Sequence, residues 1–195
     1  MALVIFSLTG QVAWTVENMY FNVFIYKMFN ASADAISLMV AASAIAATVT
    51  TLIIGALSDK IGKRKIFICG GYIAWGVTIW SFSLVRMDVI HALFPAAASA
   101  AALGVSLTII LDCVMTFFGS SANDACFNAW LTDMSDDSNR GAVEGINAMM
   151  PLVSILVVFG GFMSFDLNLA QSWTTIFNII GIAVIGIGVL GIFLI

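Results

Sequence analysis

The chain has little charge for its length. Only 9% of its 195 residues are charged, whereas an ordinary soluble domain has about 25%. A soluble protein of this size could not cover its surface with so few charges. Hydrophobic residues make up 62% of the sequence, and this composition is typical of a protein whose solvent is the lipid of a membrane.

Cysteine, histidine and clustered basic residues are also scarce. The three cysteines (Cys69, Cys113 and Cys126) lie in or beside apolar stretches and lack metal-ligand spacing, so neither a disulfide framework nor a metal site is expected. No cofactor is expected either. The sequence has no basic patch of the kind that nucleic-acid binding requires, which removes nucleic acid from the expected partners.

Long apolar runs dominate what remains. A spanning helix needs about 20 mostly apolar residues, and six segments reach that length. The sequence therefore predicts an all-α, polytopic membrane bundle of six transmembrane helices, as one domain over residues 1–195. The approximate spans are Leu3–Phe29, Ala35–Leu57, Ile66–Val85, Ala96–Phe118, Val143–Phe165 and Trp173–Ile195.

The end of the fourth span is left open. Residues Gly119–Thr132 are less apolar but contain no strong helix breaker, so the helix either stops near Phe118 or continues to about Asp133. A helix from Ala96 to Asp133 would be about 57 Å long at 1.5 Å per residue. That exceeds a hydrocarbon core of about 30 Å, so such a helix would begin later or protrude, and protrusion would place Asp124 outside the membrane.

The distribution of basic residues predicts the orientation. Loops two and four carry five of the seven, and the other two are Lys27 and Arg86 on the opposite side. Because cytoplasmic loops are enriched in Lys and Arg, both termini are expected in the cytoplasm, most simply at a plasma (inner) membrane. The five are Lys60, Lys63, Arg64, Lys65 and Arg140.

The second loop carries the most specific motif. Its glycines suit a close helix crossing at Gly55 and a tight turn with positive φ at Gly62. Asp59 can pair with a cation, and the basic cluster would lie at the anionic inner leaflet. The motif reads Gly55-Ala56-Leu57-Ser58-Asp59-Lys60-Ile61-Gly62-Lys63-Arg64-Lys65.

This loop resembles the signature G-x-x-x-D-[RK]-x-G-[RK]-[RK] of the major facilitator superfamily, which lies between helices two and three. The resemblance implies the first six-helix half of a transporter, which works by alternating access with solute bound between two halves. It also implies a second half as partner, either in the same chain beyond residue 195 or as another copy, and a fragment is the expected case. The cytoplasmic gate motif would then consist of Gly55, Asp59, Gly62, Lys63, Arg64 and Arg140, with Arg140 placed to pair with Asp59.

A second stretch, Asn123–Trp130, is similar to the end of helix four in sugar:cation symporters of the glycoside–pentoside–hexuronide branch. In that branch an acid on helix four contributes to cation and sugar binding, and Asp124 matches it. The resemblance implies sugar symport with Asn123 and Asn128 at the site. The branch also carries acids on helix two, where this chain has Ala47, Thr48, Thr50 and Thr51, so a sodium site of that design is not expected.

A polar stripe runs along the first span. Its residues fall within about 120° of arc at about 100° per residue, and they are Gln11, Trp14, Thr15, Asn18, Asn22 and Tyr26. Amides and indoles suit a hydroxyl-rich solute, so the stripe predicts a substrate-binding wall. The alternative is hydrogen bonding to a neighbouring helix, at about 0.6 kcal/mol per contact.

Glu17 and Asp112 lie in the spans, and Asp124 joins them if the fourth helix continues within the membrane. An acid at mid-bilayer costs about 2.5–3.5 kcal/mol on insertion scales, and no basic residue of the spans is placed to offset it. These acids must be protonated, bind a cation, face water or meet a partner in the second half. They are therefore candidates for proton or cation coupling.

The sequence thus predicts a secondary active transporter of a small polar solute, with a sugar or glycoside as the expected solute and membrane lipid as its surroundings. The alternative is a non-transporting membrane sensor or assembly module that retains the fold. An enzyme is not expected, because intramembrane aspartyl proteolysis requires Tyr-Asp and Gly-x-Gly-Asp motifs and the chain has neither.

Overall fold

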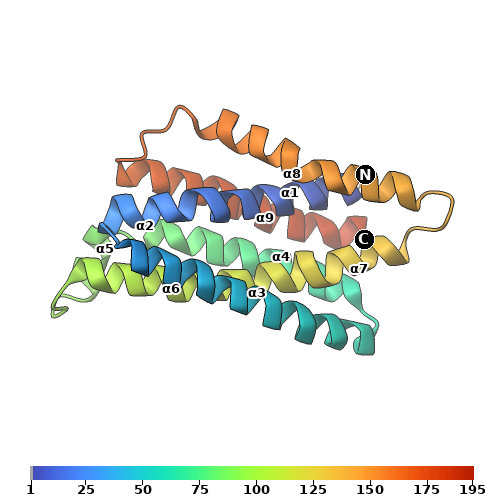
Figure 1. Ribbon diagram of the computed structural model, residues 1–195, viewed down its shortest axis with the longest axis horizontal. Helices are drawn as coiled ribbons and strands as arrows, with labels where there is room; N and C mark the ends of the chain where they lie inside the picture. The colour runs from blue at the N-terminus through green and yellow to red at the C-terminus, as the bar shows by residue number, and fades with distance from the viewer. Residues whose placement is uncertain (1) are drawn as a thin grey trace.

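A computed structural model describes residues 2–195, and its helices run along one common axis (Figure 1). Within this part of the chain there is no strand, as expected for an all-α bundle. Short η segments join some of the helices. The elements are α1 (Ala2–Val16), η1 (Glu17–Phe21), α2 (Asn22–Phe29), α3 (Ala33–Ile61), α4 (Arg64–Ser81), η2 (Phe82–Leu84), α5 (Met87–Leu93), α6 (Ala100–Gly119), η3 (Ser120–Phe127), α7 (Asn128–Asp133), α8 (Arg140–Phe162) and α9 (Ala170–Leu194).

Two of the rods are composite. The first rod, α1–η1–α2, contains a π-helical turn that begins at Glu17, and the backbone stays right-handed at both of its junctions. The fourth rod, α6–η3–α7, contains a π-helical segment at Ser120–Phe127. The fourth rod has 34 residues and is about 50 Å long at about 1.5 Å per residue. The fourth segment therefore begins at Ala100, later than Ala96, and continues through Asp124 to Asp133.

Five helical segments are long and apolar enough to cross a membrane. They are α3, α4 with η2, the fourth rod, α8 and α9. The first rod is not among them, and it carries Gln11, Glu17 and Asn18 along its length. The polar stripe thus sets this rod apart from the other five.

Local sequence signals explain where α3 begins and ends. At its start the Ser32 hydroxyl accepts a hydrogen bond from the Ala35 N–H at 3.2 Å, which satisfies a free donor of the first turn. At its end Gly62 adopts φ +68°, and its N–H donates to the Ser58 carbonyl. Glycine adopts this left-handed conformation without strain, so the positive φ expected at Gly62 is present.

The bundle is held together by close helix contacts. The α4 helix packs along α9, α1 packs against α8 and α9, and α3 packs against α6 and η3. A Cβ added at Gly76 of α4 would lie 2.7 Å from the Gly181 carbonyl oxygen of α9, so only glycine permits this approach. Small residues at helix crossings are typical of membrane bundles.

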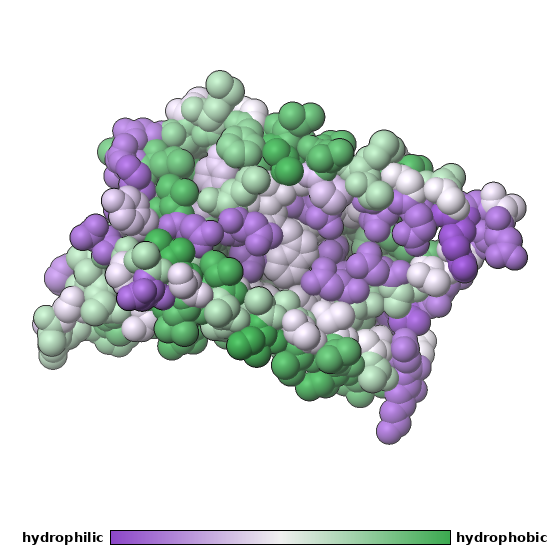
Figure 2. All heavy atoms as spheres, in the orientation of Figure 1, coloured by the Kyte–Doolittle hydropathy of each residue, from purple (hydrophilic) through white to green (hydrophobic). Residues whose placement is uncertain are grey.

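The two ends of the bundle differ in their number of basic residues. Both termini, the α3–α4 turn and the α7–α8 loop lie at one end, and α5 lies at the other (Figure 1). The five basic residues of the α3–α4 turn and the α8 start are therefore all at the terminal end. One face of the molecule has a hydrophilic band between two apolar margins (Figure 2).

Candidate functional site

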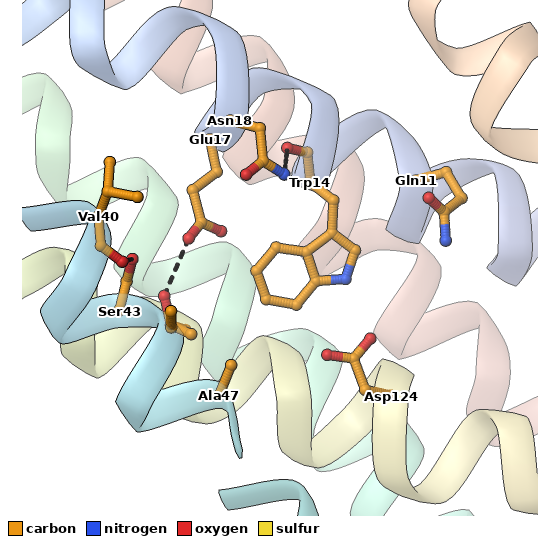
Figure 3. Close-up of a pocket in the computed structure, with 10 residues that line it drawn as sticks. Gln11, Trp14, Glu17, Asn18, Val40, Ser43, Ala47 and Asp124 are labelled. Carbon is orange, nitrogen blue, oxygen red and sulfur yellow. Dashed lines mark hydrogen bonds between the residues drawn. The ribbon is translucent and has the colours of Figure 1, made fainter. Parts of the chain in front are cut away.

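A cavity of about 400 Å³ lies between the first rod, α3 and the fourth rod. Figure 3 shows Trp14 and Glu17 projecting from the first rod into the space between Ser43 and Ala47 of α3 and Asp124 of the fourth rod. We call this space the large cavity. Its lining consists of Gln11, Trp14, Glu17, Asn18, Val40, Ser43, Ala44, Ala47, Thr116 and Asp124.

The first rod supplies the polar wall of the large cavity. Gln11, Trp14 and Asn18 lie on one side of the rod, and the π-helical turn places Glu17 in the same lining. The Asn18 amide donates to the Trp14 carbonyl oxygen at 2.9 Å. That bond leaves the carbonyl oxygen of the Asn18 amide available to a ligand. Single π-helical turns within α-helices are frequent at functional sites.

Glu17 bridges the first and fourth rods. Its Oε1 accepts a hydrogen bond from the Thr116 hydroxyl at 3.0 Å. Its Oε2 is buried and has no hydrogen-bond partner among the described residues. A buried acceptor without a donor costs about 1–3 kcal/mol, so this oxygen is a strong candidate for ligand or ion contact.

Asp124 is supported by a hydrogen-bonded pair behind it. The Asn123 amide donates to Asp124 Oδ1 at 3.1 Å. The Tyr72 hydroxyl lies 2.8 Å from Asn123 Oδ1 and 2.9 Å from the Phe6 carbonyl oxygen. Gly10 makes room for this pair, because a Cβ there would lie 2.3 Å from Asn123 Oδ1. The first rod and α4 thereby fix the position of Asn123, and Asn123 positions the Asp124 carboxyl.

A small cavity of about 110 Å³ adjoins the same wall. Glu17 and Asn18 line both cavities, whereas Asn22 and Asp112 line only the small one. Asp112 is 1% exposed. The rest of the small-cavity lining is Phe21, Met39, Val40 and Ser43.

The structure does not bring every predicted site residue into a cavity. Asn123 is 3% exposed and lies behind Asp124, where it positions that carboxyl. Asn128 is exposed, and its amide donates to the Asp124 carbonyl oxygen at 3.3 Å. Thr15 of the polar stripe instead meets Ser154 of α8, with 2.7 Å between the two hydroxyl oxygens, and Tyr26 lines neither cavity. The remaining binding and coupling candidates line one or both cavities.

Two parts of the large-cavity lining were not predicted from the sequence, the α3 wall and Thr116. The α3 wall consists of small or aliphatic side chains such as Ser43 and Ala47, which inside an apolar run look like ordinary lipid-facing or packing positions. Their helical spacing from Val40 is the only signal. Thr116 was missed for the same reason, since nothing in the sequence indicates that its hydroxyl meets Glu17.

At the terminal end, Arg64 forms the central ion pair. It lies 2.8 Å from Asp59 and 2.5 Å from Asp133, so it joins the end of α3, the start of α4 and the end of α7. The predicted pair of Arg140 with Asp59 is wrong, because within residues 2–195 Arg140 forms no ion pair. Arg64 lies two residues after Gly62, so the turn brings it beside Asp59, and Arg64 rather than Arg140 forms the ion pair.

The rest of the motif surrounds this ion pair. Asp59, Gly62, Lys63 and Arg64 line a cavity of about 410 Å³ at this end. Gly55 does not serve a close helix crossing as expected, since a Cβ there would meet nothing within 4 Å in the described part of the chain.

In the α7–α8 loop, Asp136 organises the turn. Its Oδ1 accepts hydrogen bonds from the Ser138 hydroxyl and from the Ser138 and Asn139 N–H groups. These donors stabilise the carboxylate and lower the pKa of Asp136 below its usual range. The loop therefore has its own ordered structure without an ion pair to Arg140.

Together these features define a polytopic helical protein of the membrane with a polar cavity between its rods. A family model described as Major Facilitator Superfamily matches residues 3–195, so the chain belongs to that superfamily. Its transporters are in general not enzymes. A comparison with curated proteins found no match, and neither did one with solved structures. The likeness to the sugar:cation symporter branch stays a prediction.

Proposed function

We propose that this protein is a secondary active transporter that moves a small polar solute by alternating access, coupled to a proton or a cation. The observation that carries the proposal is the large cavity. It lies between three rods and joins amides, an indole and two carboxyls in one lining. Its volume of about 400 Å³ falls in the range of small-molecule sites, about 300–1,000 Å³.

The chemistry of the lining favours a hydroxyl-rich solute. Gln11 and Asn18 offer both donors and acceptors, and Asp124 offers an acceptor. The Trp14 indole gives a flat apolar surface beside them. A sugar or glycoside presents hydroxyl groups around an apolar ring face, so it is the solute class we propose.

The acids of the cavity walls support the coupling. The fourth rod has no Lys, Arg or His, and the only basic residue of the first rod is Lys27 near its end. Among the described residues, no ion pair joins Glu17 or Asp124 to a basic side chain. A proton or a cation taken up with the solute would neutralise them, which makes loading with both partners more favourable than loading with either alone.

The terminal end would serve as the cytoplasmic gate of this cycle. The ion pair of Arg64 with Asp59 and Asp133 ties three helices together, and breaking it would free α3 to move. In the proposal this end and both termini face the cytoplasm at the plasma membrane, and the first rod crosses the bilayer as the sixth span. A second six-helix half, in the same chain or in another copy, completes the solute site.

The test is uptake of labelled solutes by the full-length protein in proteoliposomes, with a panel of sugars and other small polar solutes. Gln11→Ala should raise KM for the transported solute about tenfold, since one hydrogen bond to the solute is worth about 1 kcal/mol or more. Gln171→Ala is the matched control, because Gln171 is exposed at the start of α9. Solute binding without uptake under any gradient would instead favour a sensor that retains the fold.

A further inference from the structure

Three side chains of the small-cavity lining each have an oxygen atom that is buried without a hydrogen-bond partner among the described residues. These atoms are Glu17 Oε2, Asp112 Oδ1 and Asn22 Oδ1. All three side chains line the same cavity of about 110 Å³. Glu17 and Asn22 come from the first rod and Asp112 from the fourth rod, so each composite rod contributes one carboxylate.

The orientation of the Asn22 amide is fixed by its other end. Its Nδ2 donates to the Asn18 carbonyl oxygen at 3.3 Å, so its Oδ1 is the atom left without a partner. The Glu17 carboxyl is fixed in the same way, because Thr116 donates to Oε1 and leaves Oε2 without a partner. Ser43 of α3 adds a hydroxyl oxygen to the lining.

We propose that the small cavity is a sodium site, in which Na⁺ is bound by Glu17, Asp112 and Asn22 with Ser43 as a further oxygen ligand. Hard oxygen ligands suit alkali and alkaline-earth cations. A proton on either carboxyl would give one donor and could satisfy only one of the other two acceptors. A cation can contact all three oxygens at once, so it offsets more of the desolvation penalty than a single proton does.

The charge and size of the site select among cations. Two carboxylates attract a small ion most strongly, because the Coulomb energy rises as the separation falls, which favours Na⁺ and Li⁺ over K⁺. Within residues 2–195 no group of three or more His, Cys, Asp or Glu side chains is arranged to hold a metal ion, and the oxygen atoms of this lining are ligands that most transition metals do not prefer. The volume leaves room for the ion and a water, each water taking about 30 Å³.

This inference rests on the proposed function for its purpose, since a sodium gradient would then drive the solute. Glu17 lines both cavities. Sodium in the small cavity would hold the Glu17 side chain in place for the large one. The site itself can be tested without any transport.

The experiment is thermal unfolding of the purified full-length protein in detergent, with choline replaced stepwise by Na⁺, Li⁺, K⁺ or Ca²⁺ at constant ionic strength. A ligand that binds only the folded state raises Tm with its concentration. Na⁺ and Li⁺ should raise Tm, and K⁺ should not. Asp112→Asn and Asn22→Leu should each weaken the apparent Na⁺ affinity at least tenfold.

Glu144→Gln is the matched control, because Glu144 is an exposed acid at the start of α8 that lines neither cavity. This variant should keep the Na⁺ response. A Tm that does not respond to Na⁺, a response to Ca²⁺ alone, or an equal loss in Glu144→Gln would overturn the sodium site. A retained Na⁺ response together with absent solute uptake would support the sodium site and refute the transport function.

Discussion

The contact of Gly10 with Asn123 allows a quantitative test of the packing behind the large cavity. In Gly10→Ala the new Cβ would lie 2.3 Å from Asn123 Oδ1 and 2.8 Å from the Tyr72 hydroxyl. Asn123 is buried and hydrogen-bonded on both sides, so it cannot swing away without losing a partner. Overpacking of this kind costs about 1–3 kcal/mol. For a chain of about 200 residues, 2 kcal/mol corresponds to a Tm lowered by about 4–8 °C.

Thermal unfolding in detergent, followed by a fluorogenic maleimide, measures this change. Cys69 and Cys126 are buried and react only on unfolding, and a Cys113→Ser background removes the half-buried third thiol. Gly70→Ala is the matched control, since a Cβ there meets nothing within 4 Å, and it should leave Tm unchanged or slightly raised. In an Asn123→Ala background the effect of Gly10→Ala should shrink. Equal Tm values for Gly10→Ala and Gly70→Ala would refute the packing account.

Three further changes address the α3–α4 turn and the Glu17 contact. Gly62→Ala should lower stability by about 1–2 kcal/mol because φ is +68° there, and the same assay should find Gly55→Ala neutral. Arg64→Gln should lower the free energy of unfolding by about 0.5–2 kcal/mol. The loss should be smaller in 1 M salt, because the partner carboxylates are exposed and salt screens them. A loss that does not depend on salt would contradict the ion-pair account. Thr116→Val should lower kcat/KM for uptake about 10–100-fold by removing the hydrogen bond to Glu17, whereas Thr108→Val, which loses only a bond to Gly104 of its own helix, should not.

The sequence predicts the bundle because the apolar runs are long and their breaks are sharp. Helix ends follow from local chemistry, as at Ser32 and Gly62. The fate of the segment after Phe118 could not be decided, because Ser120–Phe127 is polar enough for a loop and is held helical by its contacts with α3 and α4. The π-helical geometry at Glu17 has no sequence signal of its own.

The site was predicted where polar residues stand out against an apolar background. Trp14, Asn18 and Asp124 do so, and they line the large cavity. The α3 residues of the lining could not be predicted in this way. A serine or an alanine in an apolar helix becomes part of the site only because the first and fourth rods place polar side chains opposite it. The pairing of Asp59 was mistaken because charge alone does not rank two arginines, and the turn geometry favours Arg64.

Coupled uptake tests the central claim most directly. The full-length protein in proteoliposomes is given a transported solute, with and without an imposed proton or sodium gradient. The account predicts that a gradient drives accumulation and that Glu17→Gln abolishes it, while Glu144→Gln, an exposed acid at the start of α8, retains it. Accumulation that is equal in Glu17→Gln and the unchanged protein, or solute binding with no uptake under either gradient, would contradict it.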